Sequence, residues 1–215
     1  LKAAGALDPH LLQLKDFISA RTKLLKQICN IKASVNELEG INDKSHQKLI
    51  VKSLKSAIDG ITKSISNIEE QIKKIIAANQ GFKRSYDLLI SIPGIGHVTA
   101  VYLIGCTANF AGNPSGKQLA CYAGVAPFEH SSGISIKGKT RVHRMANKDL
   151  KKLLHLCALS VIQYNEEFKV YYRRKKDEGK HSMSILNAVR NKIALRVAAV
   201  IKNQTPYKNN YKLVA

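Results

Sequence analysis

The sequence is poor in acidic residues: 15 Asp and Glu stand against 35 Lys and Arg, which gives 215 residues a formal net charge of +20. It also lacks any apolar run of the roughly 18–20 residues that a membrane-spanning helix needs. Its first ten residues, LKAAGALDPH, have no basic region followed by an apolar core, so they are not a signal peptide. We therefore expect no membrane partner. Because the chain does not begin with Met, we also expect it to be the interior of a longer protein.

Cysteine is scarce as well, and no two cysteines form a Cys-x-x-Cys pair. The four cysteines, Cys29, Cys106, Cys121 and Cys157, lie far apart in the sequence. This spacing argues against a zinc site. Small buried thiols in a reducing compartment are the simpler interpretation, so we expect a cytoplasmic protein.

What the sequence does contain is basic charge and enough apolar residues to fold. The hydrophobic fraction of 45% is typical of a folded chain. A surface this basic attracts polyanions, and nucleic acids and acidic membranes are the usual ones. With membranes set aside, nucleic acid is the expected partner.

The first 80 residues have the periodicity of long helices. Between residues 54 and 75, apolar residues recur at alternating steps of four and three, at Leu54, Ile58, Ile61, Ile65, Ile68, Ile72 and Ile75. This is a heptad stripe, typical of a coiled coil. An earlier stripe has the same period and two charged seam positions, at Leu11, Leu14, Ile18, Arg21, Leu25, Ile28, Lys32 and Val35.

Residues 39–43, Glu-Gly-Ile-Asn-Asp, separate these stripes and predict a turn. Residues 1–80 are therefore predicted to form a coiled-coil arm, either as an antiparallel hairpin or with a seam shared with a second chain. A narrow apolar stripe needs a partner, so a homo-oligomer through this arm is expected. A purely structural arm is the alternative.

Residues 81–215 are predicted to form a compact, mainly α-helical domain. The expected helices cover residues 82–92, 98–106, 115–122, a long segment capped by Asn147, and about 183–202. A loop covers residues 124–145. Within it, Ser135-Ile136 and Arg141-Val142 are predicted to pair as a small hairpin.

Pro93-Gly94-Ile95-Gly96 interrupts an apolar stretch between two of these helices. Backbone amides of a glycine-rich turn beside a helix N-terminus bind anions, and the missing Cβ allows a phosphate to approach. The spacing resembles the helix-hairpin-helix motif of proteins that grip DNA without sequence preference. Gly94, Ile95 and Gly96 are therefore candidate phosphate contacts, and a turn that only packs two helices is the alternative.

A second unusual stretch, residues 124–154, combines serines with cations. Ser131, Ser132 and Ser135 lie close to the cationic or histidine positions Lys137, Lys139, Arg141, His143, Arg144 and Lys148. A serine surrounded by cations can attack a phosphodiester, because the cations stabilise the charge that develops on the phosphorane oxygens. The simpler interpretation is that these serines are polar loop residues.

Three ordered stretches, PGIGHVTAVYL, NPSGKQLACYAGVAPFEHSSG and KGKTRVHRMANKDLKKLLHLCA, resemble the C-terminal domain of the Piv-invertase-like transposases of insertion sequences. This family includes recombinases that are guided by a bridge RNA. The resemblance covers residues 82–206 and implies DNA as substrate, with a guide RNA left open as a second partner. It also implies a serine nucleophile at Ser132, with Ser131 as its rival.

In that family a separate N-terminal RuvC-like domain holds Mg²⁺ with four acidic residues. No comparable carboxylate cluster is visible here, so no cofactor is expected in this chain and Mg²⁺ is expected in the missing domain. The chain also departs from the family's usual Lys-x-Gly-Asn and Leu-Arg, with Ala146 before Asn147 and Lys151 after Leu150. These departures leave one turn and one phosphate contact open, and they do not affect the serine.

Two alternatives remain open beside a transposase fragment. One is a non-catalytic, dimeric nucleic-acid-binding module, which would tolerate alanine at Ser132. The other is a tyrosine recombinase, but the spacing of His143-Arg144 and Tyr171-Tyr172 does not match that family. The run from Tyr171 to Lys176, which includes Arg173 and Arg174, is interpreted as a basic aromatic stretch that contacts nucleic acid or as a solvated helix end.

Overall fold

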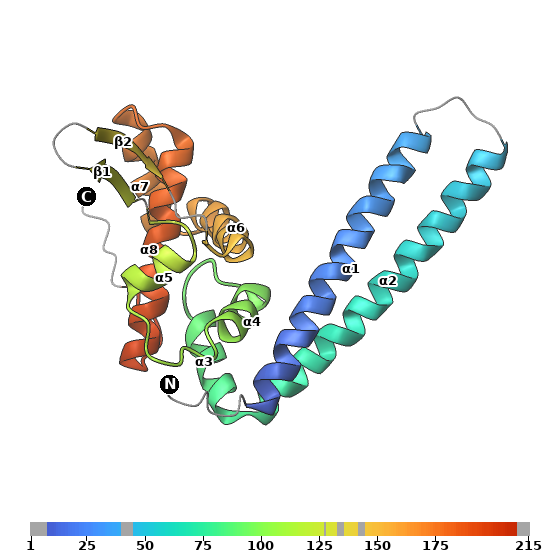
Figure 1. The fold of residues 1–215 in the computed structure, drawn as a ribbon, viewed down its shortest axis with the longest axis horizontal. Helices are drawn as coiled ribbons and strands as arrows, with labels where there is room; N and C mark the ends of the chain where they lie inside the picture. The colour runs from blue at the N-terminus through green and yellow to red at the C-terminus, as the bar shows by residue number, and fades with distance from the viewer. Residues whose placement is uncertain (1–7, 40–44, 127, 133–135, 142–144, 210–215) are drawn as a thin grey trace. The chain divides into compact units, whose positions relative to one another are not determined.

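The computed structural model describes residues 8–39, 45–126, 128–132, 136–141 and 145–209. The chain divides into two compact units, Leu1–Gln80 and Gly81–Ala215 (Figure 1). Helices dominate both units, and the described strands form one short hairpin. The prediction of a mainly α-helical protein is confirmed.

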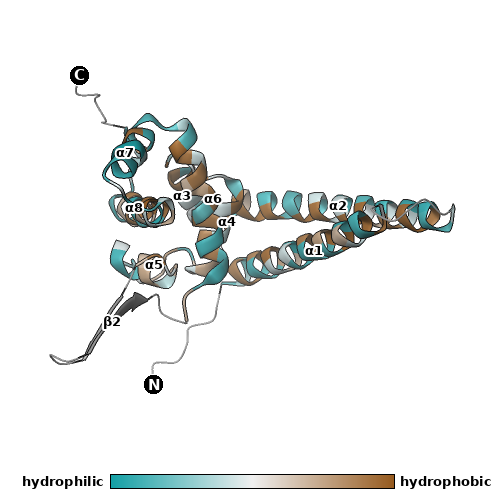
Figure 2. Ribbon diagram, turned by 90° about the horizontal axis from the view of Figure 1, so that it is seen from above, coloured by the Kyte–Doolittle hydropathy of each residue, from teal (hydrophilic) through white to brown (hydrophobic). Residues whose placement is uncertain are grey.

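The first unit is a pair of long helices, α1 (Pro9–Glu39) and α2 (Ser45–Ala78), which pack side by side. Figure 2 shows hydrophobic and hydrophilic segments alternating along both helices. The buried apolar side chains of these two helices are Leu11, Leu14, Val35, Ile65, Ile72, Ile75 and Ile76. The other members of the α2 stripe, Leu54, Ile58, Ile61 and Ile68, are half-buried. One neighbouring helix therefore covers only part of the stripe.

The predicted seam of α1 is wrong at two positions in its second half, while Ile28 is half-buried and Val35 is buried as predicted. Leu25 is 37% exposed and Lys32 is exposed, whereas Leu24 and Ile31 are half-buried. In the structure the α1 seam runs from Ile18 to Arg21 to Leu24, which are two successive steps of three residues. The seam positions Leu24 and Ile31 therefore come one residue earlier than a strict heptad predicts. Arg21 itself does lie in the seam, where its Nε donates a 2.8 Å hydrogen bond to Glu69 Oε1 of α2.

The second unit is built around its last helix. In chain order it contains α3 (Gln80–Ile90), α4 (His97–Cys106), α5 (Gly116–Tyr122), α6 (Lys148–Tyr164), α7 (Glu166–Asp177) and α8 (Ser182–Asn203). Helix α8 packs against α5, α6 and α7, and α6 also packs against α4. Helix α8 is apolar on most of its circumference and buries Ile185, Leu186, Val189, Ile193, Ala194, Val197, Ala198, Val200 and Ile201. A helix of this kind belongs in a core.

Side-chain caps explain where several helices begin. Ser115 and Gln118 form a reciprocal capping box at α5, and the Asn147 side chain accepts a hydrogen bond from the Leu150 amide at α6. Such caps satisfy amides that have no partner within the helix. Asn165 caps α7 in the same way, accepting from the Phe168 amide at 3.3 Å. The sequence interpretation treated α7 only as a basic stretch or helix end, although its cap was present in the sequence.

The serine segment contains a hairpin of β1 (Phe128–Ser132) and β2 (Ile136–Arg141), paired antiparallel. The predicted hairpin is therefore wrong, because Ile136 and Arg141 belong to the same strand. The prediction placed the turn at Gly138 and its neighbours. Instead, Gly138 lies within β2, opposite His130. The local pairing is irregular between Phe128 and His130.

A left-handed turn follows α4. Ala108, Asn109 and Phe110 have φ values of 50°, 54° and 59°, a conformation that costs roughly 1–2 kcal/mol per residue that is not glycine. The Asn109 amide donates to Ile104 O at 2.7 Å, and the Phe110 amide donates to Thr107 Oγ1 at 3.0 Å. Phe110 is only 4% exposed, so burial of its ring offsets part of the cost.

Candidate nucleic-acid interface

The glycine turn between α3 and α4 packs closely on α6. Gly94 has φ of +83°, which favours glycine. A Cβ built at Gly94 would lie 2.3 Å from Val161 Cγ1 and 2.9 Å from the Cys157 carbonyl oxygen. The turn needs this glycine for its own packing, so the requirement at Gly94 does not by itself point to a phosphate.

Gly96 has a different environment. It is exposed, its φ of −93° suits any residue, and a Cβ there would meet nothing within 4 Å. It precedes α4 and, having no side chain, does not cap this helix end itself. A helix N-terminus attracts anions through its first amides and the helix dipole. Ile95 is 5% exposed and its amide donates to Ile92 O at 3.1 Å, which leaves Gly96 as the best placed of the three predicted contacts.

The first residue of α4 is held against α3. Tyr86 Oη lies 3.0 Å from His97 Nδ1, and the two rings meet edge to face with their centroids 5.6 Å apart. Burial, and to a smaller extent Asp87, raises the pKa of Tyr86 above its ordinary value. The Tyr86 hydroxyl therefore stays neutral, and the pair fixes the α4 N-terminus next to the glycine turn.

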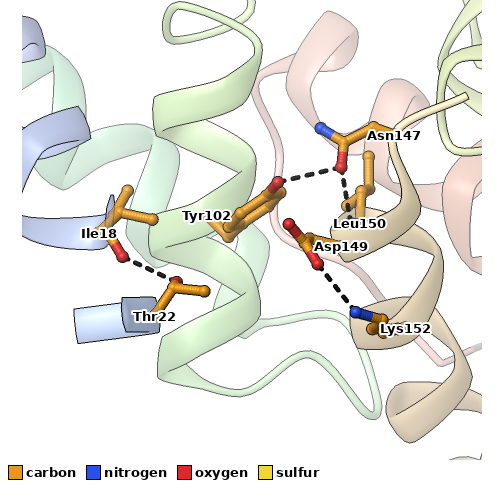
Figure 3. Close-up of polar contacts among 7 residues, drawn as sticks. All are labelled: Ile18, Thr22, Tyr102, Asn147, Asp149, Leu150 and Lys152. Carbon is orange, nitrogen blue, oxygen red and sulfur yellow. Dashed lines mark hydrogen bonds and ion pairs between the residues drawn. The ribbon is translucent and has the colours of Figure 1, made fainter. Parts of the chain in front are cut away.

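Asn147 organises the start of α6 (Figure 3). Its Oδ1 accepts from Tyr102 Oη at 3.0 Å and from the Leu150 amide at 2.9 Å, while its Nδ2 donates to Tyr122 Oη at 3.0 Å. Burial raises the pKa of Tyr102, so its hydroxyl remains a donor at neutral pH. One amide side chain thus joins α4, α5 and α6.

Figure 3 also shows two local contacts. Asp149 and Lys152 form an exposed 3.1 Å ion pair, and Thr22 Oγ1 of α1 donates to Ile18 O of its own helix.

Both ends of the serine hairpin are attached to this helical framework. On the leading side, the Val125 amide donates to Ala120 O at 2.9 Å, and Asn187 Nδ2 of α8 donates to Val125 O at 3.0 Å. On the returning side, the Asn147 amide donates to Tyr122 O at 2.7 Å. Val125 before the hairpin and Asn147 after it are thus both held by the helices.

The predicted nucleophile lies at the end of β1. Ser132 is its last residue and pairs with Ile136, while Ser131 pairs with Lys137. Lys139 and Arg141 follow at alternate positions of β2. Arg144 and His143 lie outside the described residues. The backbone pairing therefore brings both serines next to the cationic strand, and it does not select one of them.

The remaining predicted cations lie on two helices. Lys148 is the exposed first residue of α6, and Arg173 and Arg174 are exposed on α7. The Tyr171 ring lies between cations: Lys192 Nζ is 4.0 Å and Arg174 Cζ is 5.8 Å from its centroid. This tyrosine is thus already in contact with two cations of its own chain.

Sequence reasoning missed two groups, the buried Arg190 on α8 and the half-buried His155 on α6. Arg190 is 6% exposed, and His155 Nδ1 is buried without a hydrogen-bond partner. The signal was a single arginine on the apolar face of a helix, where charged residues are rarely found unless they are paired.

The described residues contain no group of three or more His, Cys, Asp or Glu side chains that could hold a metal ion. The donor set that a Mg²⁺ site needs is therefore not found in this part of the chain. Nor do the described helices include one long and apolar enough to cross a bilayer.

Residues 86–173 match the model of the transposase IS116/IS110/IS902 family. A pilin gene-inverting protein of Moraxella bovis is 29% identical over 192 residues, which cover 86% of this chain and 58% of that protein. The 43.6 kDa protein of insertion element IS110 from Streptomyces coelicolor is 30% identical over 162 residues, 75% of this chain and 38% of that protein. A transposase for insertion element IS1111A from Coxiella burnetii is 26% identical over 95 residues, 44% of this chain and 25% of that protein.

The chain thus spans less than two thirds of the length of these relatives. The matched segment begins in α3 and ends in α7, so it includes the glycine turn, the serine hairpin and the Asn147 framework. The region that carries the candidate interface is therefore the region that is similar to the transposases of the IS116/IS110/IS902 family.

Proposed function

We propose that this chain is the part of a DNA transposase or site-specific recombinase that binds DNA and supplies a serine nucleophile. The observation that carries the proposal is the family match over residues 86–173, which includes Ser132 and the junction that Asn147 makes between α4, α5 and α6. The relatives, a gene-inverting protein and insertion-element proteins, support the same class of reaction.

In the proposed reaction, Ser132 Oγ attacks a phosphorus atom of the DNA backbone. An Oγ–P bond forms and the P–O bond to one strand end breaks. The serine gives up its proton, and the departing oxygen of the DNA takes up a proton. Strand exchange follows when the hydroxyl of another strand end attacks the phosphoserine, which releases the serine again.

The cations of β2 suit this reaction. Lys137, Lys139 and Arg141 lie on the strand that pairs with the serine strand. Negative charge increases on the phosphoryl oxygens as the phosphorane forms, and nearby cations stabilise it. Hydrogen bonds hold Val125 before the hairpin and Asn147 after it, and a nucleophile whose position is limited reacts more readily.

DNA binding itself is proposed to be mainly electrostatic. The charge of +20, the exposed cations Lys148, Arg173 and Arg174, and the α4 N-terminus beside the exposed Gly96 all suit phosphate contacts. A guide RNA would bind through the same phosphate contacts, and its use stays a prediction. A homo-oligomer formed through the α1–α2 arm also stays a prediction.

No step of the proposal is routed through a metal, because the residues described here do not fit one. Mg²⁺ in a separate acidic domain remains a prediction. If the metal lies in a separate domain, the 215-residue chain alone should bind DNA without forming a covalent adduct.

The test compares Ser132→Ala with Ser131→Ala in the full-length protein. We expect Ser132→Ala to abolish strand exchange and the covalent DNA–protein adduct seen on a denaturing gel, while DNA affinity changes less than about twofold. Ser131→Ala serves as the matched neighbour and should retain activity. The opposite pattern would make Ser131 the nucleophile. Full activity of both variants would favour the alternative, a non-catalytic nucleic-acid-binding module.

A salt titration tests binding by the 215-residue chain. If six or more phosphates are neutralised, affinity for duplex DNA should fall about 10³-fold or more between roughly 50 and 200 mM salt. A flat titration would reject the electrostatic interface. A covalent adduct formed by this chain alone would reject the divided site.

A further inference from the structure

Arg190 is a charged side chain in an apolar setting. It lies on α8 between core residues, is 6% exposed, and its Nε donates to Leu186 O at 3.4 Å. Among the described residues no carboxylate forms an ion pair with it. Burial without an opposite charge nearby disfavours the charged form of Arg190 and lowers its pKa. Because a buried guanidinium is strongly unfavourable without an anion, its presence here calls for one.

His155 provides an unsatisfied nitrogen on the neighbouring helix. Its Nδ1 is buried without a hydrogen-bond partner, which is unusual for a polar atom in a folded protein. Helix α6, which carries His155, packs against α8. Burial and then the charge of Arg190 lower the pKa of His155. The imidazole therefore lies within the electrostatic reach of the guanidinium.

Asn187 relates this pair to the serine hairpin. Asn187 and Arg190 are three residues apart on α8, a spacing that places two side chains on one helix face. The Asn187 amide donates to the Val125 carbonyl at 3.0 Å, three residues before β1 begins. Arg190 therefore lies within about one helical turn of the point where the hairpin is attached.

We infer that Arg190 and His155 form a binding site for a phosphoryl anion beside the attachment point of the hairpin. The guanidinium provides a planar fork of donors that matches two phosphoryl oxygens, and His155 Nδ1 provides a third nitrogen. The anion site rests on the burial of the Arg190 side chain and on the unsatisfied Nδ1 of His155. Its use for a backbone phosphate of DNA or RNA, as opposed to free phosphate, rests on the proposed function.

The first experiment uses inorganic phosphate and the 215-residue chain. Isothermal titration at constant ionic strength, with sodium chloride as the reference salt, should detect saturable phosphate binding. Arg190→Met, which keeps a long unbranched side chain, should weaken it at least tenfold. Lys202→Met is the matched control, because Lys202 is an exposed cation on the same helix and its removal changes net charge equally. It should change phosphate affinity less than twofold.

A spectroscopic measurement keeps the inference testable if Arg190→Met does not fold. In the wild-type chain, phosphate should shift the His155 ring-nitrogen resonances, while chloride at equal ionic strength should not. His155→Gln, which retains a polar side chain, should bind phosphate more weakly. Absence of saturable phosphate binding by the wild-type chain, or binding that Arg190→Met and Lys202→Met reduce equally, would overturn the site.

A second arm distinguishes the source of the phosphate. If the site takes a nucleic-acid phosphate, duplex DNA or single-stranded RNA should displace inorganic phosphate, and Arg190→Met should lower nucleic-acid affinity more than Lys202→Met does. If the site takes free phosphate, nucleic-acid affinity should be equal in the two variants. Phosphate binding in a chain that binds no nucleic acid would retain the anion site and reject the proposed function.

Discussion

The backbone amide of Tyr207 donates a 2.8 Å hydrogen bond to Ser91 Oγ, although 116 residues separate the two in sequence. Ser91 Oγ in turn donates to Leu88 O at 2.6 Å. The Tyr207 ring lies 4.9 Å from the Arg196 guanidinium, which pairs with Glu167. The C-terminal segment is thus attached to the residue that enters the glycine turn.

Ser91→Ala should remove both hydrogen bonds and lower the free energy of unfolding by about 1–2 kcal/mol, since it leaves the Tyr207 amide without its acceptor. Hydrogen exchange should also become faster from Ile92 to Gly96, because the turn loses its tie. Urea denaturation and exchange mass spectrometry measure the two effects. Ser64→Ala is the control, because exposed Ser64 bonds only to Gly60 O of its own helix. Equal behaviour of the two variants would contradict the role of Ser91.

Substitution by alanine should lower the stability of the fold at Gly94 and leave it nearly unchanged at Gly96. Gly94→Ala meets both a positive φ and contacts of 2.3 and 2.9 Å, so it should destabilise the fold by roughly 2–4 kcal/mol. Gly96→Ala has open space and an ordinary φ, so it should unfold at nearly the wild-type denaturant concentration.

Gly96→Ala tests the interface as well. If DNA phosphates approach the α4 N-terminus, its methyl group should weaken DNA binding several-fold in a protein whose circular dichroism is unchanged. Unchanged affinity in the folded variant would leave the turn as packing alone.

Asn147→Ala should be among the more destabilising polar substitutions. It removes the α6 cap and the bonds to Tyr102 and Tyr122, for a loss of about 2–3 kcal/mol. Asn147→Asp keeps both acceptor roles and loses only the donor to Tyr122, so about half of that loss is expected. Denaturation of the three proteins by urea measures this order. A smaller loss for Ala than for Asp would show that the amide does not organise this junction.

Ile61→Asp combined with Ile68→Asp should lower the mass of the particle in light scattering. These two side chains are only half-buried by the arm itself, so a second chain would gain by covering them. Thr62→Asp with Ser66→Asp adds the same charge at exposed positions and should leave the mass unchanged. An unchanged mass and helicity in the first variant would show that this stripe does not join subunits.

Local patterns predicted most of the helices in this protein. The apolar period and the cap residue are contained in a few neighbouring positions, which is why α4, α8 and the Asn147 cap agree with expectation. Gly94 shows the limit of such reasoning. A glycine in a turn signals close approach, but only the folded chain reveals that the approaching group is the Cys157 carbonyl of α6.

The errors arise where distant residues decide the structure. The side of α1 that becomes buried depends on α2, so Leu24 replaces Leu25 in the seam. The left-handed conformation at Ala108 opposes the residue's own preference and persists because Phe110 is buried. In the candidate site, Arg190 was missed because its setting is created by helices far apart in sequence.

The ion pair of Arg21 and Glu69 also limits how α1 and α2 can slide along one another. A slip of either helix along the other would leave a guanidinium that is 19% exposed in the seam without its carboxylate. A polar pair in an apolar seam therefore helps to fix the register of the two helices. The arm therefore keeps α1 and α2 in one alignment, so its half-buried apolar side chains lie at the same height in every copy of the chain.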